Sequence, residues 1–451
     1  MIEKTSRLEQ AAIVGLSYDI LVQIIDSLVV NDAVHFLSTC SSLHTIMKDE
    51  WFWKHLCSHH GVPDATAFGV HSFRALFTTL LYPYSPLLGL WAGDHPFTGN
   101  ILEFRVVPRF GKQPGGIVGE MWRFRVLELE SGDEPEAPET PEFVPLVWIG
   151  FSQQDLVRGR TDAATALSAQ LFCCVDATRK HAMELKVLPE TALGTILHTR
   201  HGQFMHPDFP DPELSAWLDT CRALPRVTDT SLKSAHYPPL SPLRSRPRVF
   251  ELFPVPTDCW KPRAIALTCE RGCIKASQPF LGFKNDAPFP PRYYPLRHCV
   301  PRGISPSSDS WSPASLCGLW LGSYSSHGTE CVFVGWDETR RSLRAVKITG
   351  DENVPRGVVS WEARAPPADF ASLDANEQQS CSRVLGGDVH RCLLFRGAGT
   401  MSSRGFLPSG RYFPSMVLAI SSIDEMNVVW LDTGAEWGSS FVRCKGCRRD
   451  P

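Results

Sequence analysis

Residues 16–28 read Leu-Ser-Tyr-Asp-Ile-Leu-Val-Gln-Ile-Ile-Asp-Ser-Leu. Apolar side chains occupy positions 16, 20, 21, 24, 25 and 28, which is the spacing of one face of an α-helix. Ser17 stands where the helix would begin, and its side-chain oxygen can accept a hydrogen bond from a backbone N–H that has no partner within the helix. The stretch therefore predicts an amphipathic helix that buries one face.

The segment after this helix predicts three more short helical pieces. Asp32 would cap a second helix, Leu43 and Met47 belong to a third, and residues 49–57, which contain Trp53-Lys54, close the unit. In this order the pieces resemble the F-box, the three-helix module that docks a substrate receptor onto the Skp1 subunit of a cullin–RING ubiquitin ligase. The alternative is an ordinary core of amphipathic helices, and helical spacing alone does not exclude it.

The F-box resemblance has consequences for partners and for individual residues. It implies an F-box over residues 10–60 and, through Skp1, an association with cullin-1 and a RING subunit. The residues implied in Skp1 binding are Leu16, Ile20, Leu21, Ile24, Ile25, Leu28, Leu37 and Trp53. Residues 61–85 form a helical linker in this interpretation, and its last helix is expected to end before Pro83 because proline cannot continue a helix.

Composition narrows the class of protein. The chain has 451 residues, enough for about two to four domains, and its 43% hydrophobic residues are enough for a core. A formal net charge of −3 argues against nucleic-acid binding. No apolar run approaches the roughly 20 residues that cross a bilayer, so we expect no membrane partner. The 15 cysteines are scattered and predict reduced thiols in a cytoplasmic or nuclear protein.

The character of the sequence changes after residue 85. Short alternating or β-branched runs such as 101–107 predict strands separated by Gly and Pro. We therefore expect an α+β protein, in which the F-box is followed by a mainly antiparallel β-barrel over residues 86–443. Loop insertions are expected at 131–142, which is acidic and Pro-rich, at 225–248 and 284–313, which are Pro-rich, and at 363–388, which is polar. Residues 444–451 are expected to form a basic, solvated tail, and Arg443 is the first of its basic residues.

An internal repeat occurs within the strand-rich part. Gly89-Leu90-Trp91-Ala92-Gly93 is followed by Gly99 and then a strand, and Gly318-Leu319-Trp320-Leu321-Gly322 is followed by Gly328 and then a strand. The pattern predicts two equivalent hairpins, each with a buried Trp and a glycine-containing turn. Two unrelated hairpins that share turn chemistry would give the same pattern.

The second copy leads into a turn, Thr349-Gly350-Asp351-Glu352-Asn353-Val354-Pro355, which follows a strand ending at Lys347. Together with the Gly-Leu-Trp hairpins, 324–328, the Gly-x-Gly at 397–399, Arg404-Gly405-Phe406 and Val429-Trp430-Leu431, this turn resembles the F-box-only receptors with a C-terminal β-barrel that bind cyclin D in animals. The resemblance covers residues 16–443 loosely, and the middle diverges, so the substrate itself is not carried over.

The resemblance implies a barrel that binds a short substrate segment or chain terminus in its end loops. The residues implied in substrate binding are Tyr324, His327, Lys347, Thr349, Gly350, Asp351, Asn353, Gly399, Arg404 and Phe406. The Asp351 carboxylate could accept hydrogen bonds from a peptide, or it could serve only its own loop as a turn cap. His327 could bond a peptide backbone or be a solvated turn residue.

Three groups of Cys and His residues could supply metal ligands. Cys269/Cys273 and Cys444/Cys447 each supply two of the four ligands that a structural zinc site needs, and His198/His201/His206 is a second, weaker zinc signal. No metal and no cofactor are expected. Motifs of hydrolases, phosphate-binding loops and metalloproteases are missing from the sequence. We expect a non-catalytic substrate receptor of an Skp1–cullin–F-box ligase that promotes degradation of its substrate. A barrel that binds a small molecule or metal is the alternative, and a hydrolase ranks third.

Overall fold

The structure is a computed structural model, and its description covers part of the chain. Described are residues 15–93 except 29, residues 101–151 except 111–112, 125–137 and 139, the segments 169–174, 181–187, 265–269 and 292–295, and residues 306–444 except 307, 325–327, 352, 355–357, 404–407 and 432–436. Among these residues, no helix combines the length and the apolar character that crossing a membrane requires.

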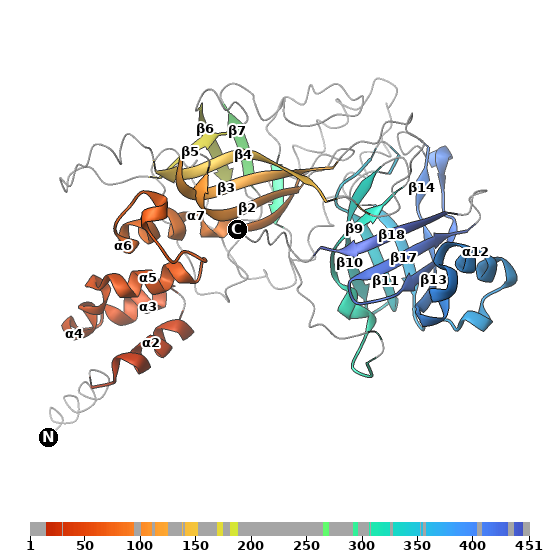
Figure 1. The fold of residues 1–451 in the computed structure, drawn as a ribbon, viewed down its shortest axis with the longest axis horizontal. Helices are drawn as coiled ribbons and strands as arrows, with labels where there is room; N and C mark the ends of the chain where they lie inside the picture. Colours follow the sequence, from red (N-terminus) through yellow and green to blue (C-terminus); the bar gives the residue numbers. More distant parts are fainter. Residues whose placement is uncertain are drawn as a thin grey trace.

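The N-terminal part is helical, as the sequence predicts (Figure 1). Its helices are α2 (Tyr18–Ser27), α3 (Val30–Leu37), α4 (Ser41–His44), η1 (Ile46–Lys48) and α5 (Glu50–Ser58). Asp49 caps α5, because its carboxylate accepts a hydrogen bond from Trp51 N at 3.0 Å. Ser17 precedes α2 without a side-chain cap bond, and Asp32 lies inside the first turn of α3 rather than before it. An acidic side chain is also favourable there, since it faces the positive end of the helix dipole.

Helical turns continue to residue 87, past the proline at which the sequence predicted an end. The elements are η2 (Thr66–Phe68), α6 (Phe73–Leu76), the π-helical turn η3 (Phe77–Leu81), α7 (Tyr82–Tyr84) and η4 (Ser85–Leu87). In the π turn, Tyr82 N donates to Phe77 O, one residue further back than in an α-helix. Pro83 then stands in the first turn of α7, where its lack of an N–H costs little.

In the described residues, sixteen strands form two closed antiparallel barrels of eight strands each, and β14 (Met401–Ser402) and β15 (Arg411–Tyr412) form a separate two-stranded sheet. The first barrel contains β1 (Gly89–Gly93), β2 (Ile101–Phe110), β3 (Gln113–Arg123), β4 (Glu142–Phe151), β5 (Ala169–Cys173), β6 (His181–Val187), β7 (Ile265–Cys269) and β8 (Arg292–Pro295). The second contains β9 (Gly318–Ser323), β10 (Thr329–Asp337), β11 (Ser342–Lys347), β12 (Val359–Arg364), β13 (Leu393–Gly399), β16 (Ser415–Ile420), β17 (Glu425–Trp430) and β18 (Trp437–Arg443).

The closed C-terminal barrel and the N-terminal helices agree with the sequence prediction, but the single barrel expected over residues 86–443 does not. Consecutive strands pair around each barrel, except that β13 pairs with β16 past the β14–β15 sheet, and β1 closes on β8 and β9 on β18. Eight strands enclose an interior that side chains can just fill, so sixteen strands in a row make two such barrels more readily than one wide one.

The repeated hairpins open the two barrels. Trp91 lies opposite Leu102 in β1–β2, and Trp320 lies opposite Val332 in β9–β10. Both indoles are fully buried, and each Nε1 donates to the carbonyl four residues earlier, Trp91 to Leu87 O at 2.6 Å and Trp320 to Leu316 O at 2.9 Å. The expected equivalence of the two buried tryptophans is confirmed.

Apolar cores connect these units. One continuous set of buried side chains runs from α2 through the linker helices into the interior of the first barrel. A separate core fills the second barrel around Trp320, Trp361 and Trp430. The outer faces of the two barrels pack on each other through Leu90 and Trp122 on one side and Leu319 and Phe333 on the other. The barrels stand side by side in Figure 1.

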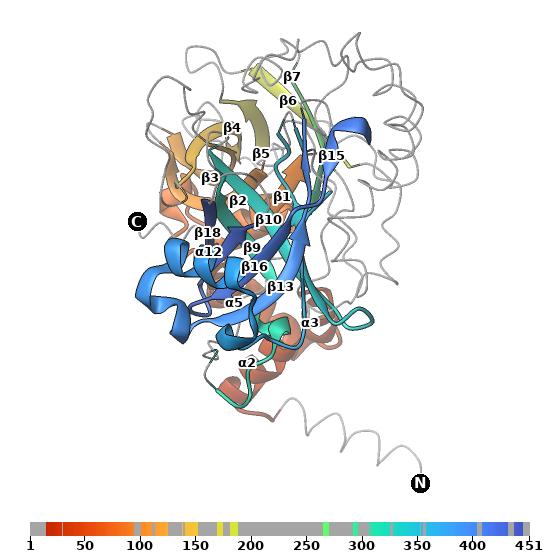
Figure 2. The same ribbon diagram turned by 90° about the vertical axis from the view of Figure 1, so that its right-hand side faces the viewer.

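Residues 363–388, expected to be a polar loop, include a capped helix. Helix α12 (Ala375–Leu385) begins at Asp374, whose carboxylate accepts from Glu377 N at 2.8 Å while the Glu377 carboxylate accepts from Asp374 N at 2.8 Å. Cys381 of this helix packs with Val417 and Val429 on the outside of β16 and β17. Figure 2 shows α12 against the strands of the second barrel.

Arg443 is buried in the structure, although the sequence placed it in a solvated basic tail. Its guanidinium donates to the carbonyls of Ser315, Cys317 and Ile423 at 2.9–3.1 Å and lies 4.5 Å from the centre of the Trp320 ring. A guanidinium has enough donors to bond three carbonyls at once. Arg443 therefore fastens the last strand to the start of the second barrel, and most of the expected tail lies outside the described residues.

Candidate protein-interaction sites

The eight residues implied in Skp1 binding lie on the N-terminal helices in different environments. Leu21, Ile25, Leu37 and Trp53 are buried in the core of this chain, Leu16, Ile24 and Leu28 are half-buried, and Ile20 is exposed. Buried side chains hold the helices together and are not available to a partner. A charge introduced at Leu21 would therefore disrupt the helices before it tested any docking surface.

Three exposed apolar side chains lie on the surface of α2 and α5. Tyr18, Ile20 and Trp51 are 42%, 44% and 38% exposed, and the rings of Tyr18 and Trp51 are 5.1 Å apart between centroids. We call Tyr18 and Trp51 the aromatic patch. Large apolar groups that remain exposed next to one another are typical of a surface that binds another protein. Ile20 follows Tyr18 by two residues in α2 and does not share its helix face. The sequence interpretation named Ile20 but missed Tyr18 and Trp51, because it looked for the apolar face of the helix and not for its flanks.

A buried ion cluster lies at one end of the second barrel. Tyr324, Glu330 and Lys347 continue the inward-facing positions of β9, β10 and β11, after Trp320, before Val332 and after Ala345 respectively. Lys347 Nζ lies 2.5 Å from Glu330 Oε1, is in direct contact with Asp351 Oδ2, and stands 5.1 Å from the centre of the Tyr324 ring. Three of the residues implied in substrate binding thus come together, and Glu330 joins them.

Charges in this cluster are set by burial. Burial raises the pKa of Glu330 to about 8, even though the neighbouring Lys347 acts to lower it. Burial alone would lower the pKa of Lys347, but the carboxylates of Asp351 and Glu330 more than offset this effect and raise it. At neutral pH, Glu330 accordingly holds its proton, while Lys347 and Asp351 form the ion pair.

The turn that carries Asp351 is held by its own side chains. Asp351 Oδ1 accepts hydrogen bonds from Asn353 N and Val354 N, both at 2.7 Å. Thr349 Oγ1 accepts from Cys331 N at 2.8 Å, which ties the turn to β10, and Gly350 lies between the two. The geometry is that of the turn cap that the sequence left open as an alternative, with the second carboxylate oxygen taken by Lys347.

Among the remaining residues implied in substrate binding, the structure describes Gly399, which packs on Trp430, a ring neighbour of Tyr324. A Cβ at Gly399 would overlap the Trp430 indole, so the glycine allows close packing inside the barrel. His327, Arg404 and Phe406 lie outside the described residues. The sequence also predicts that the loops at 324–327, 349–353 and 397–406 meet at one end of the barrel, and this stays a prediction.

A groove of about 820 Å³ runs along the outside of the second barrel. Strands β11, β12 and β13 form its floor, the segment 366–372 forms one wall, and Phe413, which is 69% exposed, contributes a large aromatic ring. Gly399 and Thr400 line the groove where β13 ends. We call it the β12–β13 groove. Its volume lies in the range of about 300–1,000 Å³ that is usual for ligand sites.

Charged side chains line the β12–β13 groove on both sides. Arg396 binds the Glu377 carboxylate through Nε at 2.8 Å and Nη2 at 2.7 Å, and its hydrogen bonds hold the pKa of Glu377 below its usual range. Glu362 lies 3.6–3.8 Å from Arg344 and Arg364. Arg364 is mostly exposed, so its guanidinium can exchange this long contact for a carboxylate or carbonyl of a bound peptide.

Comparison with known proteins bears on the second barrel. No curated protein matches the chain. Residues 302–442 match the family model described as the cyclin D1 binding domain. This stretch contains the second barrel except Arg443, the last residue of β18, together with the buried ion cluster and the β12–β13 groove. The second barrel is therefore similar to a domain whose description is the binding of another protein.

Proposed function

We propose that this protein is a non-catalytic substrate receptor of an Skp1–cullin–F-box ubiquitin ligase. The N-terminal helices would bind Skp1, and the second barrel would bind a short segment or terminus of a protein substrate. The receptor would act by holding its substrate beside a ubiquitin-loaded enzyme, which raises the effective concentration of the reacting groups. The match of residues 302–442 to a cyclin-binding domain is the observation that carries this proposal.

The aromatic patch and Ile20 support the docking half of the proposal. Tyr18, Ile20 and Trp51 leave apolar rings and a branched side chain exposed on α2 and α5, where a partner helix could bury them. Six of the described cysteines are free thiols, which suits the reducing cytoplasm or nucleus in which such ligases work: Cys40, Cys57, Cys269, Cys331, Cys381 and Cys392.

Replacing Ile20 with Asp tests Skp1 docking. Because Ile20 is exposed, the helices should fold normally, while the new carboxylate would be buried without a partner in the complex. We expect a loss of about 2 kcal/mol or more in Skp1 binding free energy, roughly thirtyfold in affinity. The measurement is titration of the full-length protein with purified Skp1. Phe413→Asp is the matched control, since it places the same charge at an exposed apolar residue of the second barrel.

Skp1 binding that stays at the wild-type level in Ile20→Asp, with Phe413→Asp behaving the same, would remove Ile20 from the docking surface. Failure of the wild-type protein itself to bind Skp1 would reject the F-box interpretation and leave an ordinary helical core.

Substrate binding is assigned to the β12–β13 groove. The groove is open along its length, has a small-residue floor at Gly397 and Ala398, and offers both an exposed aromatic ring and guanidinium donors. An extended peptide would present backbone carbonyls to the guanidinium groups and side chains to the aromatic ring. The buried ion cluster and the groove share strand β11, whose last residue, Lys347, follows the Val346–Val359 pair at one end of the groove.

Phe413→Asp, the control in the Skp1 experiment, tests the β12–β13 groove. Phe413→Asp should weaken capture of a peptide by about 1–2 kcal/mol, because it removes the most exposed aromatic contact and adds an unpaired charge. Suitable probes are purified cyclin D1 and a display library of short peptides with free C-termini. Ile20→Asp now serves as the control. Equal capture by Phe413→Asp and wild type would move the substrate site away from the groove.

A further inference from the structure

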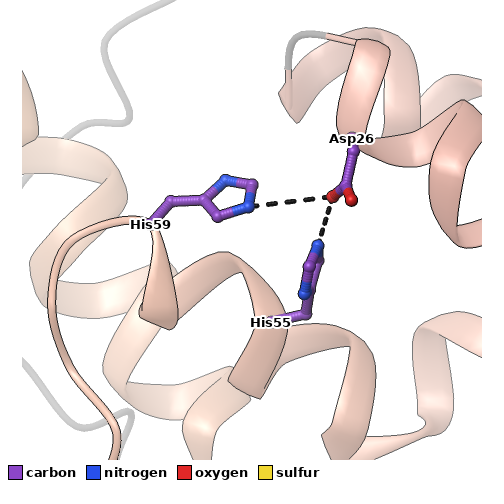
Figure 3. A group of neighbouring side chains, drawn as sticks. All are labelled: Asp26, His55 and His59. Carbon is purple, nitrogen blue, oxygen red and sulfur yellow. Dashed lines mark hydrogen bonds and ion pairs between the residues drawn. The ribbon is translucent and has the colours of Figure 1, made fainter.

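Three side chains of the N-terminal helices converge on one point between α2 and α5. Asp26 comes from the last turn of α2, His55 from the last turns of α5, and His59 is the C-cap residue directly after α5 (Figure 3). His55 Nε2 is in direct contact with Asp26 Oδ1, and His59 Nε2 lies 3.7 Å from the same oxygen. One ligand atom from each residue lies within 4.8 Å of the others.

The helix itself sets the histidine geometry. Residues at i and i+4 lie on one helix face, so His55 and His59 project side by side, and their rings are 4.8 Å apart between centroids. The same spacing is used by helices that ligate zinc through two histidines. In both residues Nε2 is the nitrogen that faces Asp26, so each ring would ligate through Nε2 with its proton on Nδ1.

The ligand chemistry and the His59–Asp26 distance agree with a cation of one class, and His55 and Asp26, which are in direct contact, would move apart to admit it. Zinc bonds to histidine nitrogen and carboxylate oxygen are about 2.0–2.2 Å long, which puts tetrahedral ligands roughly 3.3 Å apart. The 3.7 Å between His59 and Asp26 is close to this spacing. Two imidazoles and one carboxylate suit zinc and its neighbours, whereas calcium and magnesium prefer sets of oxygens.

We propose that Asp26, His55 and His59 bind a divalent transition-metal cation of the zinc class and thereby clamp α2 to α5. The site has three protein ligands and a fourth position open to water, since all three side chains are at least partly exposed. The proposal does not depend on the function of the second barrel.

The clamp would act on the surface beside it. The His55 ring stacks on Trp51 at 5.2 Å with an angle of 6° between their planes, and Trp51 contacts Tyr18. A cation held by His55 would therefore fix the orientation of a ring in the aromatic patch. It would also join the two helices that carry that patch.

His59 separates a metal site from a simple ion pair. An ion pair needs only His55 and Asp26, and His59 is half exposed and more distant from the carboxylate. Replacing His59 with Ala leaves the His55–Asp26 contact intact but removes one of the three ligands. His44→Ala is the matched control, because His44 is an exposed histidine of the same helices outside this group.

The experiment uses full-length protein without an affinity tag, stripped with a chelator and titrated with Co²⁺ and then Zn²⁺. Visible absorption of bound Co²⁺ and the melting temperature in Zn²⁺ are the two readouts. Wild type and His44→Ala should bind one more equivalent of cation than His59→Ala, or bind that equivalent at least about tenfold more tightly. Zn²⁺ should raise the melting temperature of wild type and His44→Ala more than that of His59→Ala.

Asp26→Asn should repeat the His59→Ala result, because an amide oxygen is a weaker ligand than a carboxylate. Equal cation binding in wild type, His59→Ala and Asp26→Asn would overturn the proposal, whatever thiols elsewhere in the chain bind, and would leave the cluster as an ion pair. If a variant has a lower melting temperature than wild type in the presence of chelator, its effect on the site is judged by the cation-binding titration alone.

Discussion

Replacing Lys347 with Met is expected to destabilise the second barrel by about 3–5 kcal/mol in free energy of unfolding. The lysine is 1% exposed and supplies the positive charge that pairs with Asp351, with Glu330 Oε1 2.5 Å away. Methionine has a similar length but no charge, so the Asp351 carboxylate would lose its cation while keeping the hydrogen bonds from Asn353 N and Val354 N. An uncompensated buried charge is among the most costly defects that a single substitution can make.

Asp351→Asn should cost less, about 1–3 kcal/mol. The asparagine oxygen can still accept from Asn353 N and Val354 N. Lys347 would then be neutralised by Glu330, because removing the Asp351 charge removes a cause that raises the pKa of Glu330. The cluster thus has a spare carboxylate that can take over the pairing. A cost for Asp351→Asn equal to that for Lys347→Met would show that Glu330 cannot do so.

The dependence of the free energy of unfolding on pH distinguishes a protonated Glu330 from an ionised one. The folded wild type holds the Glu330 proton up to pH about 8, whereas an unfolded glutamate releases it near its usual pKa of about 4.3. Between these values the folded state binds more protons, so this group's contribution to the free energy of unfolding falls as pH rises and levels off above about 8. That decline should be weaker in Asp351→Asn. Urea unfolding followed by tryptophan fluorescence at several pH values measures both effects, and peptide capture by the folded fraction should be unchanged.

Trp91→Ala and Trp320→Ala should each destabilise the protein by about 3–5 kcal/mol, in different parts of the molecule. Each substitution leaves a cavity and deprives one carbonyl, Leu87 O or Leu316 O, of its donor. Trp91 belongs to the core shared by the helices and the first barrel, and Trp320 to the core of the second barrel. Hydrogen exchange measured along the chain should therefore rise in separate regions for the two variants.

Trp→Phe at each position provides the matched control. It keeps most of the ring volume but loses the N–H donor, so it should cost clearly less than Trp→Ala. If Trp91→Ala loosened β9–β18 as much as β1–β8, the apolar contact between the barrels would have to make them one cooperative unit.

Sequence patterns were most informative where they repeat. The spacing of 16–28 located α2 to within about two residues, and the Gly-Leu-Trp repeat identified the opening hairpin of each barrel. The same repeat held the evidence for two barrels, since one copy begins each. A single barrel was predicted because the long stretch between the copies hides how many strands pair before the sheet closes.

Other features depend on contacts that no local pattern shows. Arg443 looks like the first charge of a basic tail, but three carbonyls from distant segments make it a buried link. Asp351 is equally suited in sequence to a ligand or to a turn, and only the position of Lys347 shows that its carboxylate is engaged. By contrast, Asp374 and Glu377 carry a capping box that could have been recognised, and His55 and His59 have a readable helical spacing.

The pairing of β9 with β18 also determines when the second barrel can close during synthesis. Because the first strand of the second barrel pairs with its last, that barrel cannot close until residue 443 has left the ribosome. Until then, β9 and β17 present open edges that can pair with other chains. The first barrel closes at β8, so it can complete its pairing while the second is still being made. Nascent chains are thus most exposed to aggregation during translation of the last hundred or so residues, and chaperone binding should be concentrated there.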